Sequence, residues 1–314
     1  VETGIAQYGT RNLGVAVGGA LIEDKLLGRA SIYSHQSDGY MENDFLNSND
    51  TQDHDEITAK GHLKWLATND LTVDLNFLHI NIDNGYDAFT LDNSRHSISD
   101  EPGEDSQNTN AFALKTDWRA SSAVQLQSSV TYAKSNVAYS YDADWTYAGF
   151  HPWAYVGFEE FKRERENYSF ELKALSNEDG LIFNNTTEWA IGIYHLAQDE
   201  DLDLSSPWTP LVNQYETENT AIFGQLDSHL SKKLTLISGL RVEYFDAKYN
   251  DSNNLDVDSD EVLFGGKLGL NYQITAQQLA YTSLSRGYKS GGVNNNDALP
   301  DSKREFDTEY MWSL

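Results

Sequence analysis

The sequence predicts an all-β fold, a transmembrane antiparallel β-barrel, and three observations lead to this prediction. Apolar and polar residues alternate along most of the 314 residues, which is the signature of strands with one apolar face. Short connections alternate with long, acidic ones between the expected strands. Aromatic residues make up 12% of the chain, with 18 Tyr and 7 Trp, and such residues form the girdles that border the bilayer in outer-membrane barrels.

The alternation is clearest between Leu234 and Phe245. Leu240 and Val242 fall on one face there, whereas Arg241 falls on the other, as a period of two requires. Extended along the chain, the pattern yields about fourteen strands. Their expected bounds are 1–8, 11–22, 26–36, 54–67, 71–83, 107–119, 123–135, 160–175, 182–197, 215–230, 234–249, 259–274, 279–288 and 305–314.

The connections between these strands follow a rhythm. Those expected to be short are 23–25, 68–70, 120–122, 176–181, 231–233 and 275–278. Those expected to be long, and mostly acidic, are 37–53, 84–106, 136–159, 198–214, 250–258 and 289–304, and only the first connection, near 9–10, breaks the rule. A soluble sandwich does not require this rhythm, whereas a barrel with short periplasmic turns and long outer loops does.

Composition excludes several classes of function. Lys and Arg number 22 against 49 Asp and Glu, a net charge of −27, which disfavours nucleic acid and anionic lipid surfaces as partners. The chain has no Cys, so it offers neither disulfides nor thiolate metal ligands. It also has no apolar run long enough for a transmembrane helix.

No catalytic constellation is apparent, and we expect that the protein is not an enzyme. The His residues show no metal-site spacing, and the glycines between Gly287 and Gly292 do not form a phosphate-binding loop. We expect no cofactor, with loop-bound Ca²⁺ as an open alternative. The oxygen ligands for such an ion would be Asp256, Asp258, Asp260 and Glu261, and plain solvation of an acidic loop accounts for the same residues.

Four motifs, in order along the chain, resemble the barrel of TonB-dependent outer-membrane receptors. The most specific is Ser285–Asn294, which reads SRGYKSGGVN, followed by Phe306–Tyr310, which reads FDTEY. The others are residues 28–33 with the loop 37–43, residues 222–226, and residues 234–236 with 239–244. Together they cover most of the chain and coincide with the expected strands.

The resemblance implies a larger protein than this chain. Receptors of this family have a plug domain inside a barrel of about 22 strands, so residues 1–314 would be a partial barrel that lacks the plug and about eight C-terminal strands. Both ends of the chain are therefore expected to be cuts. The implied location is the outer membrane of a Gram-negative bacterium. The implied partners are outer-membrane lipid, the TonB complex through the plug, and a scarce ligand, for which an iron–siderophore complex is the leading class.

Candidate ligand-binding residues lie in or beside the long connections, where aromatic faces could stack on a ligand. The alternative for these rings is that they form the outer girdle or pack the loops on each other. For Arg286 the alternative is charge balance with Glu305 and Asp307. The candidates are Tyr40, Tyr86, Trp145, Trp153, Tyr155, Trp208, Arg286 and Tyr288.

Two other functions remain open from the sequence. The same kind of receptor could import an oligosaccharide or a vitamin, since many Trp and Tyr residues in an acidic setting suit a neutral sugar. A secreted, calcium-binding all-β adhesin or carbohydrate-binding protein would also fit the acidity and the strands, although it does not predict the rhythm of short and long connections. A β-propeller enzyme is a weaker option, because no blade-like repeat is present.

Overall fold

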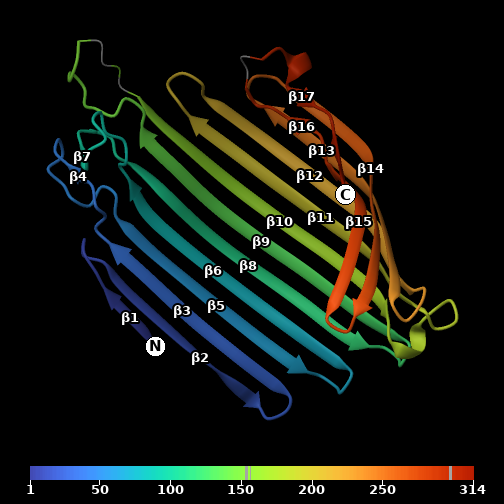
Figure 1. Cartoon of the computed structure of the whole chain (residues 1–314). Coiled ribbons are helices and arrows are strands. Elements are labelled where there is room, and N and C mark those ends of the chain that lie inside the picture. The colour runs from blue at the N-terminus through green and yellow to red at the C-terminus, as the bar shows by residue number, and fades with distance from the viewer. Residues whose placement is uncertain (153–154, 156, 297–298) are drawn as a thin grey trace.

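One antiparallel sheet dominates the protein (Figure 1). The computed structural model describes residues 1–152, 155, 157–296 and 299–314, and within them this sheet has fourteen strands. Each main strand pairs with the next one along the chain, so the sheet is a meander of hairpins. In spatial order the strands are β1 (Glu2–Ile5), β2 (Arg11–Ile22), β3 (Leu26–Ser37), β5 (His54–Leu66), β6 (Leu71–Tyr86), β8 (Gly103–Arg119), β9 (Val124–Asp142), β10 (Phe158–Ser176), β11 (Thr187–Ser205), β12 (Leu211–His229), β13 (Leu234–Asp251), β14 (Asp256–Thr275), β15 (Gln278–Lys289) and β18 (Glu309–Ser313).

Short elements occupy the connections. Figure 1 shows the tight turns gathered at one end of the sheet, with the small strands at the opposite end. Across the described residues, no helix is both long and apolar enough to cross a membrane. The short elements are β4 (Glu42–Asn43), which pairs in parallel with β7 (His96–Ser97), β16 (Gly292–Val293), which pairs with β17 (Glu305–Phe306), and the 3-10 turns η1 (Glu178–Gly180) and η2 (Asp301–Lys303).

The predicted all-β fold is confirmed, and the differences from the prediction lie at the ends of strands. Two of the predicted long connections are wrong. The segment 198–214 is mostly strand, with only residues 206–210 between β11 and β12, and the segment 250–258 reduces to residues 252–255. These acidic stretches were expected to be loops because they are polar, but in the structure their apolar residues alternate toward the buried face.

Two other boundaries are also corrected. The predicted short turn 176–181 extends to residue 186, because Phe183, Asn184 and Asn185 adopt positive φ angles of 51°, 59° and 60°, which a strand does not accommodate. The predicted last strand, 305–314, begins instead at Glu309. Residues Glu305–Phe306 fold back and pair with Gly292–Val293.

One face of the sheet changes character along the strands β10 to β14. Near the tight turns this face carries a row of apolar side chains that are cross-strand partners. Residues an even number apart in a strand share a face, and six residues further along the same strands this face carries charged side chains. Carboxylates are excluded from hydrocarbon, so the turn-proximal parts of the strands are the segments suited to lipid contact. The apolar row is Leu172, Ile193, Ile222, Val242 and Phe264, and the charged row is Glu166, Asp199, Glu216, Lys248 and Asp258.

Aromatic side chains mark the upper edge of the apolar zone. Phe77, Phe112, Tyr132 and Tyr168 are successive cross-strand partners on β6, β8, β9 and β10. The rings of Phe77 and Phe112 lie 5.0 Å apart. Such a row is typical of the interfacial girdle of a membrane barrel, where an apolar ring can keep a polar edge wet.

The opposite face carries charged side chains such as Lys173, Arg241 and Lys267 beside the apolar zone, and a packed cluster begins on it at the level of Phe264. Leu263 is fully buried, and it packs with Phe245 and Ala247, while Tyr215 and Tyr288 cover the cluster. The phase of the alternation therefore inverts partway along the strands. Beyond the lipid zone, the wall has a charged outer surface and a packed inner surface, as a sheet in water has.

The sheet does not close on itself. In the described part of the chain, β1 and β18 form its two edges, and neither pairs with a further strand. Figure 1 shows the sheet curling between these edges.

Candidate ligand-binding site

A cavity of about 680 Å³ lies at the end of the sheet that carries the long connections. A ligand site is typically lined by aromatic and apolar side chains with a few polar groups, and this cavity has that lining. A larger hollow of about 1010 Å³ over β6 to β13 is lined mainly by amide, charged and backbone groups and lacks aromatic walls. The residues around the smaller cavity are Phe89, Tyr139, Tyr141, Ala143, Trp145, Glu159, Phe161, Arg163 and Trp208.

Strands β9 and β10 supply one wall of this cavity beyond the lipid zone. Tyr139 pairs across with Phe161, and Tyr141 pairs with Glu159, so these four side chains share a face. Tyr141 donates a hydrogen bond of 2.6 Å to Glu159 Oε2. Burial, together with this carboxylate, raises the pKa of Tyr141, so the phenol keeps its proton and remains a donor.

Two loops add rings to this wall. Phe89, in the connection after β6, stacks on Trp145, in the connection after β9, with centroids 5.2 Å apart and an interplanar angle of 11°. Phe89 also meets Tyr141 and Tyr86 edge to face, at 5.5 Å and 5.7 Å. Because these rings come from three separate segments, the site depends on how the loops are held.

Asp142, the last residue of β9, holds the turn that presents Trp145. Its Oδ1 accepts hydrogen bonds from the amides of Asp144 and Trp145, at 3.0 Å and 3.2 Å. Trp145 has a φ of 64°, a left-handed conformation that costs a non-glycine residue energy and is retained here by those bonds. Burial raises the pKa of Asp142 to about 6, against a lowering by the hydroxyl of Ser99.

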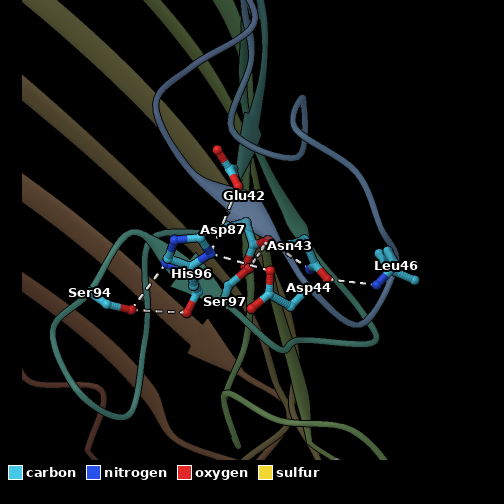
Figure 2. A network of polar contacts seen from close by, with 8 residues as sticks. All are labelled: Glu42, Asn43, Asp44, Leu46, Asp87, Ser94, His96 and Ser97. Atoms are coloured by element: carbon cyan, nitrogen blue, oxygen red, sulfur yellow. Dashed lines mark hydrogen bonds and ion pairs between the residues drawn. The ribbon is translucent and has the colours of Figure 1, made fainter.

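A polar network, which we call the loop clamp, fixes the connection that carries Phe89. Figure 2 shows its central groups, Asn43 from the β3–β5 connection with Asp87 and Ser97 from the β6–β8 connection. Asp87 Oδ2 accepts hydrogen bonds from Asn43 Nδ2 at 2.8 Å, Thr51 Oγ1 at 2.7 Å and Ser97 Oγ at 2.6 Å. Asn43 and Ser97 are 1% and 0% exposed, so their donors depend on this carboxylate.

Backbone pairing and packing extend the loop clamp. The amides of Glu42 and Asp44 donate to the carbonyls of Arg95 and Ser97, each at 2.9 Å, which forms the parallel β4–β7 pair. At the base of the first loop, Gly39 has a φ of 80°, and a Cβ there would collide with the carbonyl of Gln52, so only glycine fits.

The clamp also reaches the third loop. Phe45 stacks on Tyr147 with centroids 4.5 Å apart, and Asp100 accepts a hydrogen bond of 2.9 Å from the amide of Ala148. The β3–β5, β6–β8 and β9–β10 connections therefore form one interlocked unit beside the cavity.

The structure brings four of the predicted site residues together at the cavity. Trp145 and Trp208 line it, Tyr86 contacts Phe89 at its edge, and Tyr155 meets Trp208 edge to face at 5.1 Å. The alternative role predicted for these rings, the packing of loops on each other, is also met. Trp153 lies outside the described residues.

Three predicted residues lie elsewhere. Tyr40 sits beneath the guanidinium of Arg95, 5.7 Å from its ring centroid. Tyr288 donates a hydrogen bond of 2.9 Å to the buried Glu243. Arg286 makes other contacts than the alternative of charge balance with Glu305 and Asp307 describes: its Nη1 donates to the carbonyl of Phe264 at 2.5 Å, and its guanidinium lies 3.9 Å from the ring centroid of Tyr310.

Sequence reasoning missed the residues of the strand wall. Tyr139, Tyr141 and Glu159 fall in the predicted connection 136–159, whereas Phe161 and Arg163 fall in the predicted strand 160–175 but are not among the predicted site residues. A signal for the end of β9 was present, because Tyr139 and Tyr141 alternate with the polar residues Ser140 and Asp142, and a period of two indicates strand.

The predicted calcium residues do not converge on one point. Asp256, Asp258 and Asp260 alternate along β14 on the charged face. Over the parts of the chain that the structure describes, no group of three or more His, Cys, Asp or Glu side chains is arranged to hold a metal ion.

Comparison with solved structures gives the same fold. The ferric yersiniabactin uptake receptor FyuA from Yersinia pestis superposes with a TM-score of 0.75 at 17% identity, over 97% of this chain and 48% of that one. BauA, the ferric preacinetobactin receptor from Acinetobacter baumannii, gives 0.68 at 11% identity, over 98% and 49%. The alcaligin outer-membrane receptor FauA from Bordetella pertussis gives 0.65 at 13% identity, over 92% and 43%. The chain thus spans about half the length of the structures it matches.

The sequence also matches a family described as TonB dependent receptor-like, beta-barrel, over residues 24–309. That match decides against the soluble adhesin and the β-propeller, because it places nearly the whole sheet in a membrane barrel. The chain therefore belongs to the TonB-dependent receptor-like β-barrel family.

Proposed function

We propose that this chain is part of the barrel wall of an outer-membrane receptor that captures a scarce ligand outside the cell and imports it with energy supplied through TonB. The family consists of receptors and transporters of the outer membrane of Gram-negative bacteria, which supports this location and a role without bond chemistry. In the whole protein, a plug domain would fill the barrel and contact TonB, and further strands would join the free edges β1 and β18. Outer-membrane lipid would contact the apolar zone.

The observation that carries the proposal is the aromatic cavity at the outer end of the wall. It lies beyond the apolar zone, on the packed inner face, where a ligand would arrive before it meets the plug. Its stacked rings provide flat apolar faces, and Glu159 and Arg163 provide polar contacts, the combination expected of a small-molecule site.

The leading ligand class is an iron–siderophore complex. The compared structures with the same fold include receptors for ferric yersiniabactin and ferric preacinetobactin, which supports this class. The second candidate is a neutral oligosaccharide, which the stacked aromatic faces of Phe89 and Trp145 favour, because such faces also bind sugar rings.

Two measurements on the full-length receptor test the proposal. Ferric siderophores and oligosaccharides would be titrated into the receptor in detergent, and uptake of radio-iron would be followed in cells with and without a functional TonB. We expect binding of a ferric complex and TonB-dependent uptake. Binding of oligosaccharides alone would end the iron assignment, and uptake that does not require TonB would contradict the transport mechanism.

A further inference from the structure

Glu159 provides a fixed negative group at the cavity. Its Oε2 accepts the hydrogen bond from Tyr141, and its Oε1 accepts one of 3.0 Å from Ser206, in the β11–β12 connection. A carboxylate has about four acceptor positions, so two hydrogen bonds fix its orientation and leave acceptor capacity for a ligand. Aromatic faces with a nearby carboxylate form the environment that receives cationic groups.

The basic residue of the cavity lining is partly compensated. Arg163 lies over the ring of Phe161, 5.5 Å from its centroid, and its Nε is 3.7 Å from Glu200 Oε1. Glu200 also pairs with Arg165 on the same face of β10. Such a shared, partly exposed network holds the guanidinium to the wall and reduces the positive charge that Arg163 offers to an incoming anion.

The neighbouring charges of the same face add to the negative potential. Asp105 on β8 is the cross-strand partner of Tyr139, whereas Glu200 is shared between Arg163 and Arg165 and adds no free negative charge. Asp105 thus adds a second acidic group beside the cavity, next to Glu159, and the chain as a whole carries a net charge of −27. A surface of one sign repels ligands of that sign before contact as well as within the site.

We infer that the cavity selects neutral or positively charged ligands and rejects polyanionic chelates, with Glu159 as the discriminating residue. This inference rests on the proposed function, because it concerns the ligand of the same site. A trianion held about 6 Å from one carboxylate in a water-like medium is repelled enough to lose roughly tenfold or more in affinity. Within the iron–siderophore class, neutral and cationic hydroxamate complexes therefore fit, whereas a ferric tris-catecholate does not.

The test measures the affinities of a series of ligands of different charge for the full-length receptor in detergent, by isothermal titration calorimetry. The iron probes are a neutral ferric trihydroxamate, a ferric trihydroxamate with one free amine, and a trianionic ferric tris-catecholate. A parallel series uses hexasaccharides that are neutral, amino-substituted or uronate-based. We expect the neutral and cationic members of the series that binds to bind at least tenfold more tightly than its anionic member.

Variants separate a local effect from a general one. Glu159→Gln keeps the shape and an acceptor for the hydrogen bond from Tyr141, and we expect it to reduce the preference for the cationic over the anionic probe about tenfold, with a smaller change in binding of the neutral probe. The matched control is Glu160→Gln, which removes the same charge from the next residue of β10, on the opposite face of the sheet. We expect it to leave all affinities unchanged.

The outcomes distinguish the inference from the function on which it rests. Equal or tighter binding of the anionic probe, or an unchanged preference in Glu159→Gln, overturns the inference even if iron complexes bind. Binding confined to the sugar series, with the expected charge order, overturns the iron assignment and supports the inference. Absence of binding in both series overturns both.

Discussion

The loop clamp gives the sharpest test of how the binding site is held. Asp87→Ala removes an acceptor that serves three donors, and Asn43 and Ser97 are too deeply buried to find water in exchange. An unpaired buried donor costs about 1–3 kcal/mol, and each hydrogen bond to a charged group contributes about 1.5–3 kcal/mol. Thr51 is only partly buried, so its hydroxyl can donate to water instead. From the two buried donors we expect the clamp to lose about 3–5 kcal/mol of local stability.

Hydrogen exchange of the full-length receptor in detergent measures this loss. Peptides that contain Glu42 and Asp44, whose amides form the β4–β7 pair, should lose protection by roughly a hundredfold to several thousandfold, since each 1.4 kcal/mol is tenfold. Strand peptides from the turn-proximal zone should not change. Because Phe89 follows Asp87 by two residues, ligand affinity should fall as well.

The matched control is Asp92→Ala, in the same loop. Asp92 is exposed and accepts a hydrogen bond of 3.0 Å from the amide of Ser94, so the variant removes the same charge from the same loop but leaves the acceptor of Asn43, Thr51 and Ser97 in place. If Asp87→Ala left the β4–β7 peptides as protected as in the wild type, or if both variants opened them equally, Asp87 would not be the group that holds the clamp.

Three further expectations concern the same end of the wall. The pKa of Asp142 in the folded protein, about 6, lies above its ordinary value of 3.8, so the folded turn binds the proton more tightly than the unfolded turn. The exchange protection factors of residues 143–152 should therefore rise as the pH falls from 8 to 5. Asp142→Asn should abolish that rise and protect the turn at pH 8. Leu263→Ala should cost about 2–5 kcal/mol in denaturant unfolding, with Leu268→Ala, on the lipid-facing side, as a milder control. Trp145→Ala should weaken ligand binding at least tenfold in calorimetry without lowering the melting temperature, and an unchanged affinity would remove Trp145 from the site.

The alternation of apolar and polar residues sufficed to predict the strands, because a strand with one buried face has an apolar residue at every second position. It failed at the outer ends of β11 and β12. The prediction expects the outward face of a strand to be apolar because it contacts lipid, but this part of the wall lies in water and its outward face is acidic. The run Asp199–Asp203 is therefore wrongly predicted to be a loop. Its Leu202, which is 6% exposed, marks the inner face of a strand.

The binding site was only partly predictable, for a different reason. Loop aromatics such as Trp145 and Trp208 are conspicuous in sequence, but their partners Phe89, Tyr141 and Glu159 become neighbours only through strand register and the loop clamp. Pairing between segments many residues apart is not encoded in the local pattern of either segment. Asp87 is one carboxylate among 49 acidic residues, and nothing in its local sequence distinguishes it.

The inverted alternation constrains how such a wall can change in height. Two residues inserted at the level of Tyr132 and Tyr168 would lengthen the aqueous part of a strand. Every side chain would still point to the same face of the sheet as before, because side chains alternate with a period of two. A single added residue would turn acids inward and leucines outward above that level, unless a bulge absorbed it. Related barrels should therefore differ by even numbers of residues in the aqueous parts of their strands, and an odd difference should coincide with a β-bulge.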